Sequence, residues 1–326
     1  MSKSLRSSKY LGLWLGVLLL CTLIITTGCS SRYSRYTFYQ WVYVTNGQNV
    51  TVFEVPNNTV NLNITPVANL TGVATGLDAP NSITCDFKNN TYVTNFSGNS
   101  VTIYSPGSNG NAAPSATIIG ANTGLDGPSG IALDYQNNIY VANSLNNTIT
   151  IYAAGSSGNA TPTGTIGGLN TGLDYPTGIA IGGNGKTIIV ANKASNSIEV
   201  FNAASTGNVA PTNTIIGANT GLAGPNALIL DNYSNIFVTN GSGNSITIYS
   251  PGTTGNTAPV ATIIGSNTGL NNPSGIAVDV FGDIYVGNQS AVDIFAPIPA
   301  GTTNVAPAVT ISGSNTGLGT VVGLAL

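Results

Sequence analysis

The residues of this chain that could take part in chemistry recur at nearly regular intervals, and none of them is histidine. One set follows Gly-Leu in three places and consists of Asp78, Asp126 and Asp174. Carboxylates can bind Ca²⁺, and in a chain without imidazole they would also have to supply general acid or base catalysis. A proline stands two residues after each aspartate, so the competing interpretation is that the side chain shapes a turn.

A second set is the asparagine that ends a run rich in Val, Ile and Tyr in every interval. Six amides around one opening could bind a polar ligand such as a glycan, but the same repetition suits a structural cap. The series is Asn46, Asn95, Asn143, Asn192, Asn240 and Asn288. Its four middle members, Asn95, Asn143, Asn192 and Asn240, together with the three aspartates form the candidate ligand face.

Two further repeated patterns are expected to be turns. Aspartates that close an apolar run before a short connection suit Asx turns, and they are Asp86, Asp134, Asp231 and Asp279. The pattern Gly-Asn-x-x-Pro, which begins at Gly110, Gly158, Gly207 and Gly255, also has turn composition. From these sets we predict no catalytic residue, no metal site and no cofactor.

The interval is defined by Thr-Gly-Leu, which begins at residues 75, 123, 171, 220, 268 and 316, in steps of 48 or 49 residues. Each step contains four short runs rich in Val, Ile, Thr and Tyr, separated by Gly, Asn, Ser and Pro, as in strands joined by turns. In the clearest repeat the runs are residues 129–134, 138–142, 147–152 and 162–166. Thr and Ile alternate along residues 148–151, which favours strand over helix.

Four antiparallel strands in a unit of this length indicate a propeller blade. Complete sets begin near Asn81, Ser129, Thr177, Asn226 and Ser274, and a set beginning at Trp41 has no first strand. The missing strand is found at the other end of the chain, where residues 322–326 align with residues 129–133. We therefore predict an all-β, six-bladed propeller over residues 41–326, built of four-stranded antiparallel blades and closed by the C-terminal strand in the N-terminal blade.

Three motifs of the repeat, Pro-x-Gly-Ile-Ala-x-Asp, Asn-x-Ile-Tyr-Val-Ala-Asn and Asn-x-Ile-x-Ile-Tyr, resemble the NHL repeat and, more loosely, the YVTN-type propellers of bacterial surface proteins. The resemblance implies six blades. It leaves the function open, because such propellers include sugar-lactone hydrolases, a streptogramin-type lyase, RNA-binding domains and adhesion modules. The Arg of Asn-x-Arg-Ile is replaced by Thr148, Ser197 and Ser245, so the cationic face of the RNA-binding relatives is not expected.

The N-terminus has the pattern of an export signal. Three basic residues precede an apolar run over residues 11–25, and Thr-Thr-Gly-Cys follows, ending at Cys29. We predict a lipoprotein signal peptide over residues 1–28, lipidation of Cys29 and a tether over residues 29–40; an uncleaved membrane helix is the alternative. The protein would then be exported and lipid-anchored in the cell envelope, at the outer membrane or cell surface. The remaining cysteine, Cys85, is expected to be buried and without a disulfide.

After Cys29 the chain has five basic and 11 acidic residues, a net charge of −6. Nucleic-acid binding depends on phosphate neutralisation by Lys and Arg, so no nucleic-acid partner is expected. We predict a monomeric binding, adhesion or scaffold module for an unknown protein or glycan ligand, held on the membrane through its N-terminal lipid. The alternative is a lactonase-like hydrolase or lyase that uses acidic residues in the central funnel.

Overall fold

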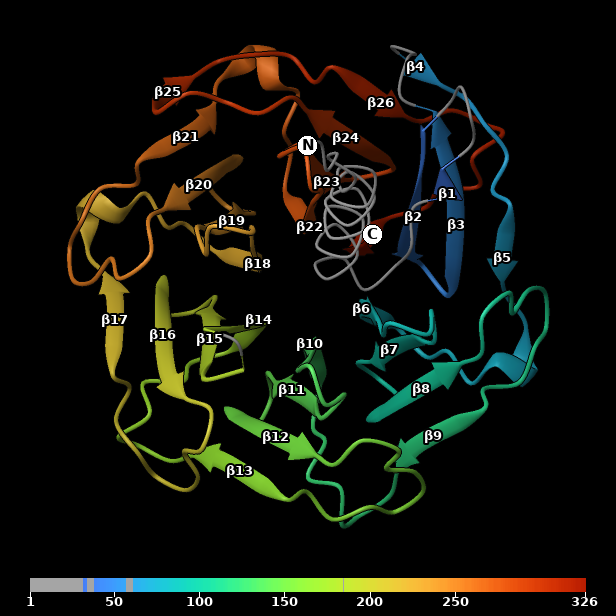
Figure 1. Ribbon diagram of the computed structural model, residues 1–326, viewed down its shortest axis with the longest axis vertical. Coiled ribbons are helices and arrows are strands. Elements are labelled where there is room, and N and C mark those ends of the chain that lie inside the picture. The colour runs from blue at the N-terminus through green and yellow to red at the C-terminus, as the bar shows by residue number, and fades with distance from the viewer. Residues whose placement is uncertain (1–31, 34–37, 57–60, 184) are drawn as a thin grey trace, which may run out of the picture.

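The computed structural model describes residues 32–33, 38–56, 61–183 and 185–326. Six antiparallel sheets are arranged as blades around a central axis (Figure 1). This confirms the predicted six-bladed propeller. The predicted signal peptide and the lipidated Cys29 lie outside the described residues. Among the helices of the described part, none is long and apolar enough to cross a membrane.

In blades 2 to 6 the four blade strands are antiparallel and run in chain order from the axis to the rim. Blade 2 contains β6 (Pro80–Cys85), β7 (Thr91–Asn95), β8 (Ser100–Tyr104) and β9 (Ala116–Ile119). Blade 3 contains β10 (Pro128–Leu133), β11 (Ile139–Asn143), β12 (Thr148–Tyr152) and β13 (Gly164–Gly167). Blade 4 contains β14 (Pro176–Gly182), β15 (Thr187–Asn192), β16 (Ser197–Asn202) and β17 (Asn213–Ile216).

The other three blades follow the same plan with additions at the rim. Blade 5 contains β18 (Pro225–Leu230), β19 (Ile236–Asn240), β20 (Ser245–Tyr249) and β21 (Ala261–Ile264). Blade 6 contains β22 (Pro273–Val278), β23 (Ile284–Asn288), β24 (Ala291–Phe295) and β26 (Val309–Ile311). Blade 1 contains β27 (Val321–Ala325), β2 (Phe38–Asn46), β3 (Asn49–Pro56) and β5 (Ala68–Leu70), with β1 (Arg32–Tyr33) added at the start of β2. Short 3₁₀ turns occur at Val73–Thr75, Ala218–Thr220 and Ser266–Thr268.

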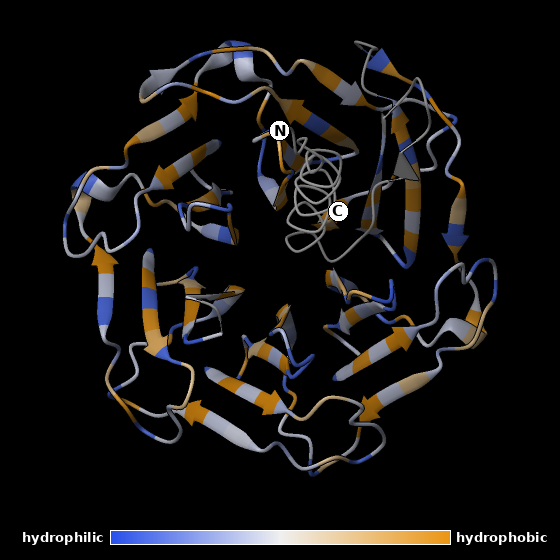
Figure 2. Ribbon diagram, in the orientation of Figure 1, coloured by the Kyte–Doolittle hydropathy of each residue, from blue (hydrophilic) through white to orange (hydrophobic). Residues whose placement is uncertain are grey.

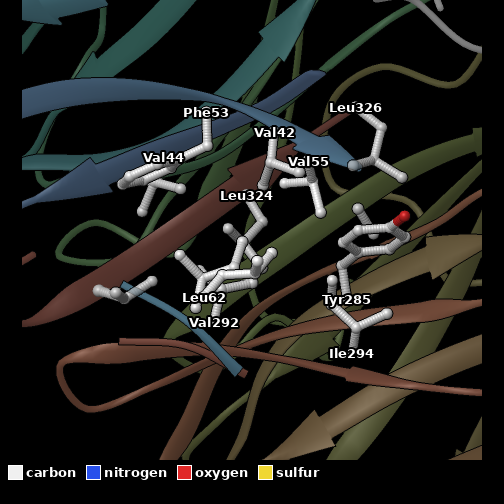
Figure 3. Close-up of a cluster of buried hydrophobic side chains, with 13 residues drawn as sticks. Val42, Val44, Phe53, Val55, Leu62, Tyr285, Val292, Ile294, Leu324 and Leu326 are labelled. Atoms are coloured by element: carbon white, nitrogen blue, oxygen red, sulfur yellow. The ribbon is translucent and has the colours of Figure 1, made fainter. Parts of the chain in front are cut away.

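The ring closes as predicted, because the C-terminal strand β27 pairs with β2 as the innermost strand of blade 1. Its side chains complete the core between blades 6 and 1. There Leu324 and Leu326 are buried with Val42 of β2 and Tyr285 of β23 (Figure 3). Blade 1 is therefore built from both ends of the chain, and the closure is held by apolar packing as well as by backbone hydrogen bonds.

The apolar side chains form six clusters, each between two neighbouring blades. The alternation along each strand, seen as bands in Figure 2, therefore does not separate core from solvent. In β12 the apolar Ile149 and the polar Thr150 are both almost fully buried, on opposite faces of the blade. Because each blade packs on two neighbours, the repeat can grow into a large ring without one large core.

The Gly-Asn-x-x-Pro pattern is more than the turn expected from its composition. The loop between the third and fourth strands runs back along the outer strand of the preceding blade and forms a parallel β-bridge with it. In four of the seams between blades the bridges are Leu70–Gly110, Ile118–Gly158, Ile166–Gly207 and Ile215–Gly255. In the other two, β25 (Gly301–Thr303) pairs with β21 and β4 (Asn61–Leu62) pairs with β26.

The asparagine of this pattern fastens the bridge, and we call the loop with its asparagine the clasp. The Asn159 Oδ1 atom accepts a hydrogen bond from the backbone N–H of Asn122 at 2.7 Å. Gly120 lies beneath it with a φ of 131°, where a Cβ atom would approach Asn159 Oδ1 to 2.5 Å. Only glycine fits this conformation and this contact. Equivalent bonds are made by Asn63, Asn111, Asn208, Asn256 and Asn304.

Cys85 is buried at the end of β6, with 6% of its surface exposed, as expected. The prediction that it forms no disulfide depends on Cys21 and Cys29, which are the other two cysteines of the chain, and both lie outside the described residues.

Candidate functional site

The two ends of the ring carry different loops. We call one end the polar face; it is formed by the second-to-third strand hairpins and by the loops that lead from one blade to the next. We call the other end the aromatic face; it is formed by the first-to-second strand hairpins. The candidate ligand residues predicted from the sequence all belong to the polar face, at the ends of the second strands or in the loops between blades.

The asparagine series is buried beneath the polar face. Asn95, Asn143, Asn192 and Asn240 are each 0% exposed. Their Oδ1 atoms accept hydrogen bonds from the backbone N–H groups of the loop before the same blade, for example from Asp126 to Asn143 at 3.3 Å. The Nδ2 atom of Asn143 donates to Thr148 Oγ1 at 3.3 Å and to Thr150 Oγ1 at 3.1 Å. The amide groups thus hold the loop to the blade, and a ligand on this face would contact the loops rather than the amides.

The three aspartates lie on successive loops of the polar face. Asp78 and Asp174 are exposed and Asp126 is half-buried. In the described part of the chain no group of three or more acidic, Cys or His residues is placed to hold a metal ion. None of the three aspartates lines the depression at the centre of this face. The structure therefore does not bring them together.

That depression, which we call the polar mouth, has a volume of about 700 Å³ and lies at the centre of the polar face. Its wall includes Asn81, Tyr175, Thr177, Lys193, Asn272 and Gln289. Thr177 is the second residue of β14, and its hydroxyl donates to the Pro225 carbonyl of the next blade at 2.8 Å. Ser274 makes the equivalent bond to Val321 at 2.7 Å. These bonds fix the wall of the mouth to the ring.

Several polar side chains of the mouth have no hydrogen-bond partner within the described residues. They include the amides of Asn81, Asn272 and Gln289, whose backbones alone are hydrogen-bonded, and the ammonium group of Lys193. None of these residues was predicted as part of a site from the sequence. A signal was present for Asn81, because the second residue of each innermost strand is small and polar in five of six blades: Asn81, Ser129, Thr177, Asn226 and Ser274, with Val322 as the exception.

The central channel opens toward the aromatic face and has a volume of about 750 Å³. Its wall consists of the innermost strands, with aliphatic side chains such as Ile83 and Ile181. Asp134 stands at its end, but both carboxylate oxygens are occupied. Its Oδ1 atom accepts from the Gln136 and Asn138 N–H groups at 2.9 and 2.8 Å, and its Oδ2 atom accepts from Asn138 Nδ2 and the Tyr140 hydroxyl.

The same arrangement holds Asp86 and Asp231, so the Asx turns predicted from the sequence are confirmed. Burial and the adjacent Asp134 carboxylate raise the pKa of Tyr140 to about 12, so the phenol stays protonated and donates to the turn. The aspartates at this end of the channel are therefore occupied in positioning the hairpins.

Two carboxyl groups lie inside blades, at positions for which no role was predicted from the sequence. Glu199 and Asp293 are 3% and 4% exposed and occupy the middle of the third strand, where the other four blades have threonine. Burial raises the pKa of both groups, although hydrogen bonds from Ser197 and Thr214 to Glu199 oppose the shift. Neither residue lines the channel or the polar mouth, so neither can reach a ligand there.

The fold and the site define a six-bladed propeller with a polar mouth at one end and a central channel walled by the innermost strands. Residues 87–224 match the family model described as "Lactonase, 7-bladed beta-propeller". This match covers less than half of the chain, and the present ring has six blades rather than seven. No curated protein sequence matches the chain.

Several solved structures share the fold. A propeller in the nidogen/laminin complex has a TM-score of 0.62 at 17% identity, covering 88% of this chain and 98% of that one. A protein of unknown function from Bacteroides caccae has a TM-score of 0.61 at 10% identity, with the same coverage of 88% and 98%. A catalytically inactive virginiamycin B lyase from Staphylococcus aureus with quinupristin has a TM-score of 0.53 at 13% identity, covering 82% and 83%. At these identities the likeness concerns the fold alone.

Proposed function

We propose that this protein is an exported, lipid-anchored propeller of the NHL-like type that binds a glycan at the polar mouth. The carrying observation is that the amides of Asn81, Asn272 and Gln289 and the ammonium group of Lys193 line one depression without an internal hydrogen bond among the described residues. Side-chain amides offer both donors and acceptors, which is the combination that sugar hydroxyls require. Ligand sites typically combine a few such groups with a preformed concave wall.

The chemistry of the mouth favours a neutral ligand with many hydroxyl groups. Lys193 is the one side chain of its described wall that is charged at neutral pH, and the exposed aspartates lie outside it. Phe96 and Tyr175 are half-buried at the wall and offer aromatic surface beside the amides. An aromatic ring provides contact area to the apolar face of a sugar, while the amides bond to its edge.

A glycan array with purified protein tests the binding function. The variants Asn81→Ala and Lys193→Gln should each reduce the signal of a bound glycan at least fivefold while the thermal melt stays within about 2 °C, since both side chains lack internal bonds. Asn122→Ala is the matched control, because this exposed amide lies on the outer part of the same face. Absence of any bound glycan, or turnover of a lactone panel that survives both substitutions, would contradict the proposal.

The anchor is tested independently of the ligand. The mature protein should begin at Cys29, carry acyl chains on it and partition into detergent. Cys29→Ser should release the protein from membranes or leave the precursor uncleaved. Unchanged membrane extraction of Cys29→Ser would contradict lipid anchoring but would leave the glycan site intact.

A further inference from the structure

The aromatic face presents large rings to solvent. Within the described residues, the aromatic side chains that are more than half exposed are Phe87 at 53%, Tyr135 at 51%, Tyr233 at 82% and Phe281 at 64%. All four stand in first-to-second strand hairpins, in blades 2, 3, 5 and 6. The rings of Phe87 and Tyr135 are nearly parallel, with an interplanar angle of 8° and centroids 6.5 Å apart. At this offset they overlap little, so they extend side by side as one platform.

Exposed cations share this face. Lys88 and Lys186 lie in the hairpins of blades 2 and 4 and are both exposed. The aspartates that follow the innermost strands on this face are mostly withdrawn, since Asp86, Asp134 and Asp279 are 4%, 8% and 9% exposed and Asp231 is half-buried, and all four accept hydrogen bonds within the turns. Asp283 is half-buried, and burial together with Asp279 raises its pKa. The exposed aspartates, Asp78 and Asp174, lie on the polar face. The two ends of the ring therefore differ in both charge and aromatic content.

β1 and the first residues of β2 lie at the aromatic face. β2 is a second strand, so it begins at this end, and β1 pairs with its first residues in the register Arg32 to Tyr39. Cys29 precedes Arg32 by three residues. Because a fully extended chain spans at most about 3.6 Å per residue, the Cys29 backbone lies within roughly 11 Å of Arg32. A lipid on Cys29 would hold the aromatic face, and not the polar mouth, next to the bilayer.

We propose that the aromatic face rests on the surface of the anchoring membrane, with its rings at the headgroup level and with Lys88 and Lys186 beside anionic lipid headgroups. This inference rests on the proposed lipid anchor. Tyr and other amphipathic aromatic residues concentrate at membrane interfaces, and each cation near an anionic surface adds to the attraction. The lipid provides the attachment, and the rings and cations set the orientation. The polar mouth then faces away from the membrane.

Tryptophan scanning of the acylated full-length protein in vesicles tests the orientation. The probe vesicles contain phosphatidylcholine and phosphatidylglycerol, with or without brominated acyl chains as quenchers. Tyr233→Trp and Phe281→Trp report on the aromatic face. Val73→Trp and Leu169→Trp are matched controls, because these side chains are 98% and 100% exposed in loops of the polar face. The native tryptophan that remains after cleavage, Trp41, contributes equally to all four variants and is subtracted with the parent protein.

The added fluorescence of Tyr233→Trp and Phe281→Trp should be quenched by brominated lipid at least twofold more than that of the two controls, and quenched less by aqueous acrylamide. Equal quenching of both pairs in acylated protein would overturn the orientation while leaving the anchor in place. If soluble oligosaccharide, and not lipid, protects the aromatic-face tryptophans from acrylamide quenching, the proposed orientation would also be overturned. The aromatic face would then be a sugar-binding surface.

Failure of the anchor is recognised separately, by the mass of the N-terminal peptide. If Cys29 carries no lipid, flotation of the unacylated protein with the same vesicles tests whether the aromatic face binds the membrane on its own. Flotation that falls at least fivefold in a Lys88→Gln, Tyr233→Ser, Phe281→Ser variant with an unchanged melt supports the membrane-facing surface. Absence of flotation overturns it.

Discussion

Replacing Asn143 by Ala should destabilise the ring far more than replacing Asn159 by Ala, although both asparagines recur in every blade and both accept a loop N–H group. Asn143 is 0% exposed and makes hydrogen bonds with Asp126, Thr148 and Thr150. Asn159 is exposed and its Oδ1 atom bonds to the N–H of Asn122. The comparison separates a buried cap from a solvent-accessible clasp.

The magnitude follows from what each substitution leaves behind. A net contribution of about 1 kcal/mol per hydrogen bond gives roughly 3 kcal/mol for Asn143→Ala, since water cannot replace the lost partners at a buried site. For Asn159→Ala water can reach the freed N–H group, so the cost is about 1 kcal/mol or less. At about 2 °C per kcal/mol for a ring of this size, the expected decreases in Tm are roughly 6 °C and at most about 2 °C.

Thermal melts followed by circular dichroism and by intrinsic fluorescence provide the assay. Coincident transitions from the two probes show that the ring unfolds as a unit, which the comparison of Tm values requires. Asn192→Ala and Asn240→Ala should behave like Asn143→Ala, because their surroundings repeat. Equal small shifts for Asn143→Ala and Asn159→Ala, or a larger shift for Asn159→Ala, would refute the assignment of the asparagine series as buried caps.

Two further outcomes are expected. Burial raises the pKa of Glu199 in the folded protein, so the stability associated with its protonated form is present below its ordinary pKa of 4.5 and is lost as the pH rises through the raised value. The Tm of Glu199→Gln relative to that of the parent should therefore increase between pH 4 and pH 8. A Tm difference that does not change with pH would contradict this. Deleting residues 320–326 removes β27 from its pairing with β2 and should abolish the cooperative melt. The control Val322→Ala, at a half-buried position of the same strand, should lower the Tm by only a few degrees. A truncated protein that melts like the Val322→Ala variant would argue against closure by this strand.

Much of the fold could be predicted from the sequence because the pattern of one blade recurs along the chain. The Thr-Gly-Leu period set the blade length, and the alternation along residues 148–151 identified a strand. The closure followed from counting strands, since one first strand was missing at the N-terminus and one was left over at the C-terminus. These inferences needed only local patterns and arithmetic, and β27 lies where they placed it.

The clasp could not be predicted in the same way. Its bridge joins Ile118 to Gly158, 40 residues apart, by parallel pairing, which has no local sequence pattern. From composition alone, Gly-Asn-x-x-Pro differs little from an ordinary turn. What could have been noticed is that Gly120 belongs to the same period as Asn159, because the two residues are needed together.

The candidate site was predicted on the polar face, and four of its seven residues, the asparagines, are buried in the structure. Repetition drew attention to Asn143 and its equivalents, yet a residue required by every blade is more readily explained by the blade than by one ligand. The polar mouth instead takes its character from residues that differ between blades, such as Tyr175 and Lys193. No local pattern marks such residues, because their role depends on where six loops meet.

The placement of β2 determines how the ring bears mechanical load. β2 is an interior strand, paired along residues 39–46 with β3 and along residues 43–46 with β27. Tension applied through the N-terminus would pull β2 along its own length, so the hydrogen bonds of both ladders would resist together in shear instead of breaking one after another. The chain thus enters the propeller at a point where pulling must displace the first and last segments of the sequence at once.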